Sequence, residues 1–268
     1  MRSRIQLLAI AVATLLFGLA PIIAEAQAPK SRLLRVQEAN TLRVGTTGDF
    51  IPMSYRDPSS NEFRGHQIDA ANELAQELGV KVEFVVTDWK TIMSAIQSDK
   101  FDIAMTGTSM SVARAKSAGF SIPWGRNAFF PLVQKKNVAK FKSWDDLNNP
   151  KVTAAFNLGT TMEQFVQTNL PKSAVRRVES PARDWQELLA GRVDFVVASL
   201  IEGAALTKQH PDLQLILMDK PKNSIPMAFL LPIDDQQWIN FVNNWITIKR
   251  QNGYFVELNK KWGLGGQD

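Results

Sequence analysis

Two periodicities alternate along the chain from residue 41 onward: short apolar runs of strand length, and longer segments in which apolar residues recur every three to four positions. Apolar residues recur at helical spacing from Ile68 to Leu78, and Gly79 ends that run as a helix-terminating residue. The same reasoning predicts strand, helix, strand, helix and strand over residues 42–45, 68–79, 80–86, 88–98 and 101–105. Such alternation is typical of a parallel sheet covered by helices.

A second alternating series begins near residue 152. Its strands and helices are predicted over residues 152–156, 161–169, 175–178, 184–190, 193–197, 201–209 and 213–217. Extended runs at residues 129–133 and 229–231 flank this series, and two helices, residues 235–252 and 254–262, close the chain. Residues 27–40 read as a polar lead-in. Two α/β series in one chain predict a cleft between them, faced by loops at the carboxyl ends of the strands.

The amino-terminal residues do not follow this pattern. Arg2 and Arg4 precede a long apolar run, and Ala24-Glu25-Ala26 is a small-x-small cleavage site. This arrangement predicts a signal peptide, residues 1–26, and a mature protein exported to the periplasm. The chain contains no Cys, so neither disulfides nor a lipid anchor on a Cys at the cleavage point are expected.

Composition and charge exclude several classes of function. With 268 residues, of which 45% are hydrophobic and 21% charged, the chain can bury a large core. The formal net charge of +5 comes from scattered Lys and Arg residues without interleaved aromatics, so we expect no nucleic-acid partner. Because His66 and His210 are far apart and Cys is missing, no metal site is expected. A phosphate-binding glycine motif is also missing, and we expect no cofactor.

The stretch from residue 101 to 121 carries the densest candidate chemistry. A buried strand is followed by a polar turn that contains Thr106, Thr108 and Ser109, and Arg114 comes five residues after Ser109. A guanidinium group can hold a carboxylate through two parallel hydrogen bonds. Hydroxyls and a guanidinium at the carboxyl end of a strand therefore predict a site for a small anionic solute. The alternative is a Ser/Thr-rich loop with a solvated surface arginine.

Several short segments follow one another along the chain: Leu42-Arg43-Val44-Gly45-Thr46, Gly65 with Ile68-Asp69, Phe101-Asp102-Ile103-Ala104, Arg114, Phe120-Ser121-Ile122-Pro123, Gly159-Thr160-Thr161 with Glu163, and Lys260-Lys261-Trp262-Gly263. In this order they resemble the periplasmic amino-acid-binding proteins of ABC uptake systems. The resemblance implies a two-lobed α/β fold, the type II periplasmic binding protein fold, in which two crossover strands form a hinge. Lobe 1 would comprise residues 41–128 plus 230–268, and lobe 2 residues 129–229. Phe129-Phe130 and Ala228-Phe229 would lie in the crossovers.

The resemblance also implies roles for individual residues. Arg114 matches the arginine that holds the ligand's α-carboxylate, and Ser109 matches a hydroxyl on the same group. Thr161 matches a threonine whose backbone N–H, at a helix start, binds the carboxylate from the second lobe. Phe50 and Trp89 match aromatic positions that sandwich the body of the ligand, with core packing as their alternative role. The remaining expected lining residues are Thr106, Thr108 and Thr160.

One departure from the family pattern concerns the ligand's ammonium group. Ser199 stands where the family usually has an aspartate, and a neutral hydroxyl cannot supply the charge-assisted bond that a buried ammonium needs. We therefore expect ordinary α-amino acids to bind poorly compared with keto or hydroxy acids, unless Glu202 or Asp194 substitutes from nearby. The family's usual Phe-Asp after Gly65 is replaced by His66-Gln67.

Four further segments carry a narrower resemblance: residues 45–50, 55–58, 210–213 and 230–232. They are similar to the periplasmic cyclohexadienyl dehydratases. Those enzymes share the fold and turn prephenate or arogenate into an aromatic acid by losing water and carbon dioxide. The glutamate that matches Glu163 is their expected general acid, whereas Met227 stands where they carry a lysine.

The sequence thus predicts a monomeric periplasmic protein that captures a small carboxylate, either amino-acid-like or a keto or aromatic acid. Its predicted partner is an inner-membrane ABC permease. A dehydratase on the same scaffold, with Glu163 as its catalytic residue, is the alternative.

Overall fold

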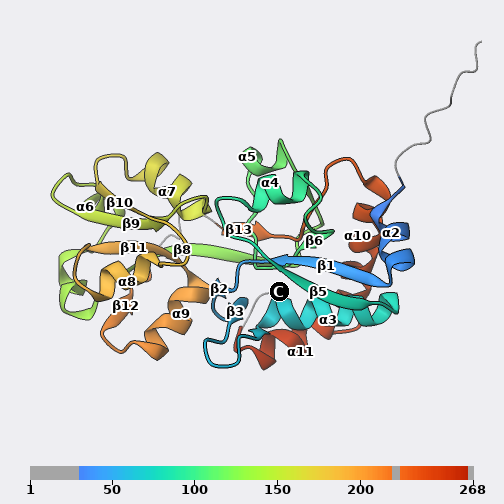
Figure 1. Ribbon diagram of the computed structural model, residues 1–268. Coiled ribbons are helices and arrows are strands. Elements are labelled where there is room, and N and C mark those ends of the chain that lie inside the picture. Colours follow the sequence, from blue (N-terminus) through green and yellow to red (C-terminus); the bar gives the residue numbers. More distant parts are fainter. Residues whose placement is uncertain (1–29, 219–223, 265–268) are drawn as a thin grey trace, which may run out of the picture. The chain divides into compact units, whose positions relative to one another are not determined.

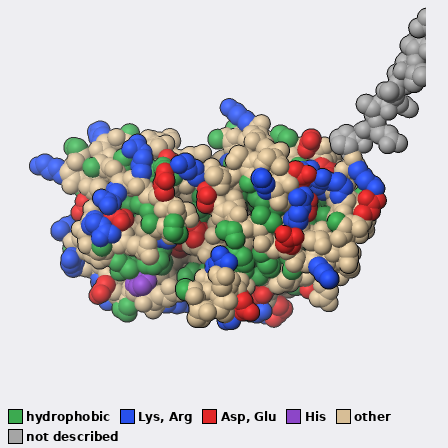
Figure 2. Space-filling model, in the orientation of Figure 1, with side chains coloured by type: hydrophobic (Ala, Val, Ile, Leu, Met, Phe, Trp, Pro, Cys, Tyr) green, Lys and Arg blue, Asp and Glu red, His purple; other side chains and the backbone are tan. Residues whose placement is uncertain are grey.

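Two β-sheets, each flanked by helices, organise the part of the chain that the computed structural model describes, residues 30–218 and 224–264 (Figure 1). The predicted signal peptide, residues 1–26, and its cleavage site lie outside the described residues. From Ser31 onward the chain forms one unit, and this unit is described by itself below. Among its described residues, no helix has both the length and the apolar character needed to cross a bilayer. Figure 2 shows positive and negative side chains scattered over the face of the molecule that it displays.

The first sheet has the strand order β5-β1-β6-β14-β7. Its strands are β1 (Thr41–Thr46), β5 (Lys81–Val86), β6 (Ile103–Ala104), β7 (Gly119–Phe120) and β14 (Leu230–Leu231). β1 pairs in parallel with both β5 and β6, as the strand–helix alternation predicted. β14 comes from the far end of the chain and pairs antiparallel with β6 and β7. The first sheet therefore needs segments from both ends of the chain.

Six helices of the described part of the chain belong to this half of the molecule. They are α2 (Arg32–Ala39), α3 (His66–Leu78), α4 (Ile92–Gln97), α5 (Val112–Ala115), α10 (Gln236–Gln251) and α11 (Tyr254–Lys261). The interpretation of residues 27–40 as a polar lead-in was wrong, because Ser31 caps α2 and Asn40 closes it in the left-handed conformation. Asp235 accepts hydrogen bonds from the hydroxyl of Ser31 and the backbone N–H of Arg32. These bonds tie α2 to the start of α10.

A small antiparallel sheet lies beside the first one. Its strands are β2 (Asp49–Phe50), β3 (Ser54–Arg56) and β4 (Phe63–Arg64). The polar cluster at residues 57–61 forms the turn between β3 and β4. This sheet holds Asp49 and Phe50 close to the carboxyl end of β1, where parallel strands leave room for a ligand.

The second large sheet has the order β10-β9-β11-β8-β12. Its strands are β8 (Gly125–Gln134), β9 (Thr153–Asn157), β10 (Ala174–Val178), β11 (Phe195–Ser199) and β12 (Leu213–Leu215). The 3₁₀ helix η1 (Lys135–Lys140) and four α-helices accompany it: α6 (Trp144–Leu147), α7 (Thr161–Asn169), α8 (Asp184–Leu189) and α9 (Leu200–Gln209). β9 pairs in parallel with β10 and β11, so the second series also forms a parallel core.

Two antiparallel strands connect the sheets. The first part of β8 pairs with β13 (Ser224–Met227), with Ser224 opposite Ala128 and Met227 opposite Gly125. Beyond this paired segment, Phe129 pairs with Ser199 in the second sheet, and Phe229 packs in the hydrophobic core of the first sheet. We call the first sheet with its helices and the small sheet lobe 1, and the second large sheet with its helices lobe 2.

Candidate ligand-binding site

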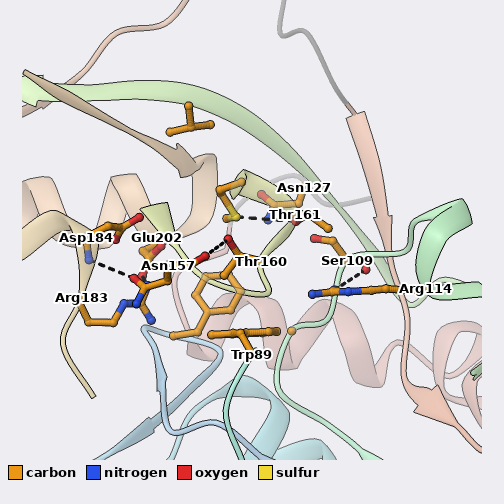
Figure 3. Close-up of a pocket in the computed structure, with 14 residues that line it drawn as sticks. Trp89, Ser109, Arg114, Asn127, Asn157, Thr160, Thr161, Arg183, Asp184 and Glu202 are labelled. Carbon is orange, nitrogen blue, oxygen red and sulfur yellow. Dashed lines mark hydrogen bonds and ion pairs between the residues drawn. The ribbon is translucent and has the colours of Figure 1, made fainter. Parts of the chain in front are cut away.

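A cavity lies between the lobes and is lined by both of them (Figure 3). The empty volume among its lining atoms, its open mouth included, is about 470 Å³, within the range of small-molecule sites. Its lining residues are Phe50, Trp89, Gly107, Ser109, Arg114, Asn127, Asn157, Thr160, Thr161, Met162, Arg183, Asp184, Val197 and Glu202. Most of them lie in loops or at helix starts that follow strands, where the ends of backbone elements leave polar groups available.

The lobes touch each other around this cavity. Arg114 of lobe 1 donates from Nη2 to the carbonyl oxygen of Gly159 in lobe 2 over 2.9 Å. Near the surface, Lys90 and Glu179 form an ion pair of 2.9 Å between the lobes. Gly159 has a φ of +79°, and a Cβ at this position would lie 2.3 Å from the carbonyl oxygen of Trp89. Only a glycine allows the two backbones to approach this closely.

Arg114 brings a buried positive charge to one end of the cavity. The hydroxyl of Ser111 caps the short helix α5 and accepts from the Arg114 backbone N–H. The side chain donates to the carbonyl oxygens of Ser109 and Gly159, and its guanidinium lies 5.9 Å from the Trp89 ring centre. Arg114 is only 5% exposed, and burial lowers its pKa to about 10. No ion pair joins it to a carboxylate among residues 30–218 and 224–264.

Further hydrogen-bond donors face Arg114 from lobe 2 and the crossover strand. Thr160 caps α7 through its hydroxyl, and the first N–H groups of that helix, beginning with Thr161, have no acceptor within the helix. Asn127, on β8, has a buried side-chain nitrogen without a hydrogen-bond partner. Figure 3 places Asn127 and Thr161 beside Ser109, on the side of the cavity where Arg114 lies. Donors from both lobes therefore converge on a region where no described residue brings a negative charge.

The other end of the cavity holds an ion-pair network that sequence reasoning missed. Arg183, at the start of α8, contacts Asp49 of β2 at 2.8 Å and Glu202 of α9 at 2.7 Å. Burial raises the pKa of Glu202 to about 7 and also raises that of Asp184. Burial alone would lower the pKa of Arg183, but the neighbouring carboxylates outweigh it and raise that pKa above its ordinary value. The network joins the two lobes, because Asp49 belongs to lobe 1.

Six of the predicted site residues line the cavity: Phe50, Trp89, Ser109, Arg114, Thr160 and Thr161. Phe50 and Trp89 contact each other edge to face, with ring centres 6.3 Å apart and planes at 65°. The indole N–H of Trp89 donates to Asp49 over 3.0 Å, which fixes the ring in place. The two aromatics thus form a continuous apolar wall in this closed arrangement.

Three predicted residues are buried but do not line the cavity. The hydroxyl of Thr106 accepts from the backbone N–H of Thr47 and so supports the preceding loop. Thr108 accepts from the backbone N–H of Ala228 through its carbonyl oxygen. Ser199 caps α9, because its hydroxyl accepts from the backbone N–H of Glu202. The hydroxyls of Thr106 and Ser199 are thus engaged by backbone N–H groups, whereas the hydroxyl of Thr108 is buried without a hydrogen-bond partner.

Glu163 lies outside the cavity lining as well. Its carboxylate accepts from the backbone N–H of Gly159 over 2.8 Å and from the side chain of Gln167 over 3.2 Å. The Glu163 backbone N–H in turn donates to the hydroxyl of Thr160. This reciprocal arrangement closes the first turn of a helix.

Eight lining residues were not predicted: Gly107, Asn127, Asn157, Met162, Arg183, Asp184, Val197 and Glu202. Glu202 had been named only as a substitute for Ser199, and the structure brings it into the cavity one helical turn after that residue. Arg183 and Asp184 stand at the start of α8, after the loop that follows β10, and this position is the signal that could have identified them. In the described part of the chain, no three His, Asp or Glu side chains are grouped so that they could hold a metal ion.

Comparison with known proteins agrees with this architecture. Residues 42–265 match the sequence profile of the bacterial extracellular solute-binding proteins, family 3. The chain is 34% identical over 239 residues to the cyclohexadienyl dehydratase of Pseudomonas aeruginosa, covering 89% of this chain and 88% of that protein. It is 26% identical over 235 residues to the L-cystine-binding protein TcyJ of Escherichia coli, covering 88% and 87% respectively.

A solved structure gives the same result for the fold. The ancestral amino acid-binding protein AncCDT-1, a precursor of cyclohexadienyl dehydratase, superposes with a TM-score of 0.80 at 38% identity, covering 87% of this chain and 99% of that protein. The predicted two-lobed α/β fold of type II and the resemblance to the dehydratase branch are thereby confirmed. With almost the whole described chain matched, the protein belongs to the bacterial extracellular solute-binding proteins, family 3.

Proposed function

We propose that this protein captures a small carboxylate in the periplasm and delivers it to an ABC permease of the inner membrane. The observation that carries the proposal is the buried guanidinium of Arg114, whose hydrogen-bond partners are carbonyl oxygens. Burying a charge without a counter-ion is costly, and a carboxylate ligand would remove that cost. The amino-acid-binding relatives and the fold support a role in solute capture.

The surroundings of Arg114 favour a carboxylate over other anions of similar size. A planar guanidinium fits two oxygens that lie in one plane, and the start of α7 can donate to the same group from the opposite lobe. The unpaired side-chain N–H₂ of Asn127 adds a donor on the crossover strand. Because these donors come from both lobes, a bound carboxylate would stabilise the closed arrangement, as in hinge-closing binding proteins.

The proposed ligands are keto, hydroxy or aromatic acids in preference to ordinary α-amino acids. Ser199 is engaged as a helix cap, and Glu202, the nearest substitute, is already paired with Arg183. An α-ammonium group would therefore compete with an internal cation for its partner. The apolar wall formed by Phe50 and Trp89 fits a flat or aliphatic ligand body.

A screen of matched compounds tests the proposal. Thermal melting of the mature protein would be measured with keto, hydroxy, aromatic and amino acids, each beside its own methyl ester, and hits would be followed by calorimetry. We expect saturable stabilisation by at least one free acid and none by its ester, since the ester lacks the negative charge that Arg114 needs. Stabilisation by esters equal to that by the acids would contradict the proposal.

A dehydratase is the second candidate, favoured by the 34% identity to the Pseudomonas aeruginosa enzyme. Against it, the carboxylate of Glu163 closes a helix turn, and Met227 is fully buried at the end of β13. We expect no conversion of prephenate to phenylpyruvate above a no-protein control near neutral pH, and nearly unchanged ligand affinity in Glu163→Gln.

The opposite result would be clear-cut. A positioned general acid typically contributes about 10²- to 10⁴-fold in rate. Multiple turnover by the wild type that Glu163→Gln abolishes would therefore replace the binding function with the dehydratase.

A further inference from the structure

Arg183 places a guanidinium group of the chain itself inside the cavity. Its side chain is 11% exposed and lies between Asp49 and Glu202, whose side chains are 14% and 8% exposed. One terminal nitrogen of Arg183 donates to the backbone oxygen of Asp49 over 2.6 Å and contacts its carboxylate at 2.8 Å. The other terminal nitrogen contacts Glu202 at 2.7 Å. Figure 3 shows Arg183, Asp184 and Glu202 together at the end of the cavity away from Arg114.

This arrangement has the chemistry of a site for a cation. Asp184 and Glu202 line this end of the cavity, Asp49 contacts Arg183 beside it, and Arg183 is the one cation among the described lining residues there. Planar, paired carboxylates are the partners that a guanidinium group prefers. The carboxyl groups come from both lobes, so a cation held between them also holds the lobes together.

We propose that this end of the cavity is a cation subsite that the chain occupies with its own Arg183, which thereby excludes ligands that carry a cationic side chain. Without the Arg183 guanidinium, the carboxyl groups of Asp49 and Glu202 would face a space of guanidinium size. An external guanidinium, free or as part of L-arginine, would then have both the room and the counter-charges to enter. For L-arginine, the placement of its carboxylate at Arg114 rests on the proposed function above, whereas the binding of its guanidinium group does not.

Chemical rescue of a variant tests the inference. Arg183→Ala removes the guanidinium, and Arg183→Met keeps more of the aliphatic stem in case the alanine variant does not fold. Each protein is melted with 10–20 mM guanidinium chloride against equal sodium chloride, and separately with L-arginine against L-citrulline, which has the same shape without the charge. The matched control is Arg192→Ala, which breaks an exposed ion pair with Glu187 on the surface of lobe 2.

We expect both Arg183 variants to melt below the wild type and to regain about 2–6 °C with guanidinium or L-arginine, and not with sodium or citrulline. The wild type and Arg192→Ala should show no such gain. Stabilisation of the wild type by L-arginine as strong as that of the variants would overturn the inference, and so would variants that fold but do not respond to guanidinium. The guanidinium arm involves no carboxylate ligand, so its result is independent of the proposed function.

Discussion

Gly159 offers the sharpest test of whether the cleft must close to hold a ligand. In Gly159→Ala the new Cβ would lie 2.3 Å from the carbonyl oxygen of Trp89, in the other lobe. An ordinary contact needs at least about 3.4 Å, so the two backbones must separate by about 1 Å. This separation breaks the hydrogen bond from Arg114 to the Gly159 carbonyl oxygen, which spans 2.9 Å. A hydrogen bond to a charged group is worth about 1.5–3 kcal/mol, which corresponds to about 10- to 150-fold weaker binding.

Gly191→Ala is the matched control for backbone strain. Both glycines have φ values in the left-handed region, +79° for Gly159 and +70° for Gly191, but a Cβ at Gly191 would meet no atom closer than 3.7 Å. An alanine in that region costs about 1–2 kcal/mol, so each variant should melt about 2–8 °C below the wild type.

Calorimetry with the best carboxylate from the screen should show the affinity loss for Gly159→Ala alone. Small-angle scattering should show a more open ligand-bound form of that variant. Equal affinity losses in the two variants would refute the reasoning, because they would trace the effect to backbone strain. Full affinity in Gly159→Ala would refute it as well.

Two further substitutions test the charges in the cavity. Arg114→Met should weaken carboxylate binding by about 2–5 kcal/mol while leaving the ligand-free melting temperature within a few degrees; the exposed Arg126→Met is the control, and unchanged affinity would contradict the role of Arg114. Burial raises the pKa of Glu202 from 4.5 to about 7, so this carboxyl group holds a proton more tightly in the folded protein than in the unfolded chain. The stability of the wild type should therefore fall as the pH rises through this window. Glu202→Gln removes that titration. Between pH 5 and pH 8, the free energy of unfolding of this variant should therefore rise relative to that of the wild type by up to about 3 kcal/mol. Burial lowers the pKa of His66 to about 4, which affects stability in the opposite direction but equally in the wild type and in Glu202→Gln. A stability difference between these two proteins that does not vary with pH would contradict the raised pKa of Glu202.

The sequence predicted correctly those helices and strands whose formation depends on neighbouring residues. The predicted helix over residues 161–169 coincides with α7, because Thr160 supplies a cap and the apolar residues that follow have helical spacing. The prediction failed for α2, a helix of only 8 residues with a single buried residue, Val36. The caps at Ser31 and Asn40, together with the contact to Asp235, stabilise that helix, and the contact is tertiary.

The cavity was only partly predictable for the same reason. Arg114 could be identified from residue type and position, since it follows a strand and carries a guanidinium suited to an anion. Thr161 was identified through the resemblance to the amino-acid-binding proteins. The pairing of Asp49 with Arg183 joins residues 134 positions apart and follows from the docking of two lobes, which no local pattern encodes. Thr106 and Thr108 have suitable chemistry, but the direction of a side chain in a turn depends on backbone angles that sequence does not reveal.

The position of β14 in the first sheet determines the order in which the molecule can be completed. This strand lies between β6 and β7, and Trp238 just after it is fully buried and donates to the backbone oxygen of Asp102. Lobe 2 is built from one uninterrupted stretch of chain, so it can fold as soon as that stretch is available. Lobe 1 must wait with an open gap in its sheet until the last forty or so residues arrive. A chain that emerges amino terminus first therefore assembles its middle before its beginning, and the half that carries Arg114 gains its final form last.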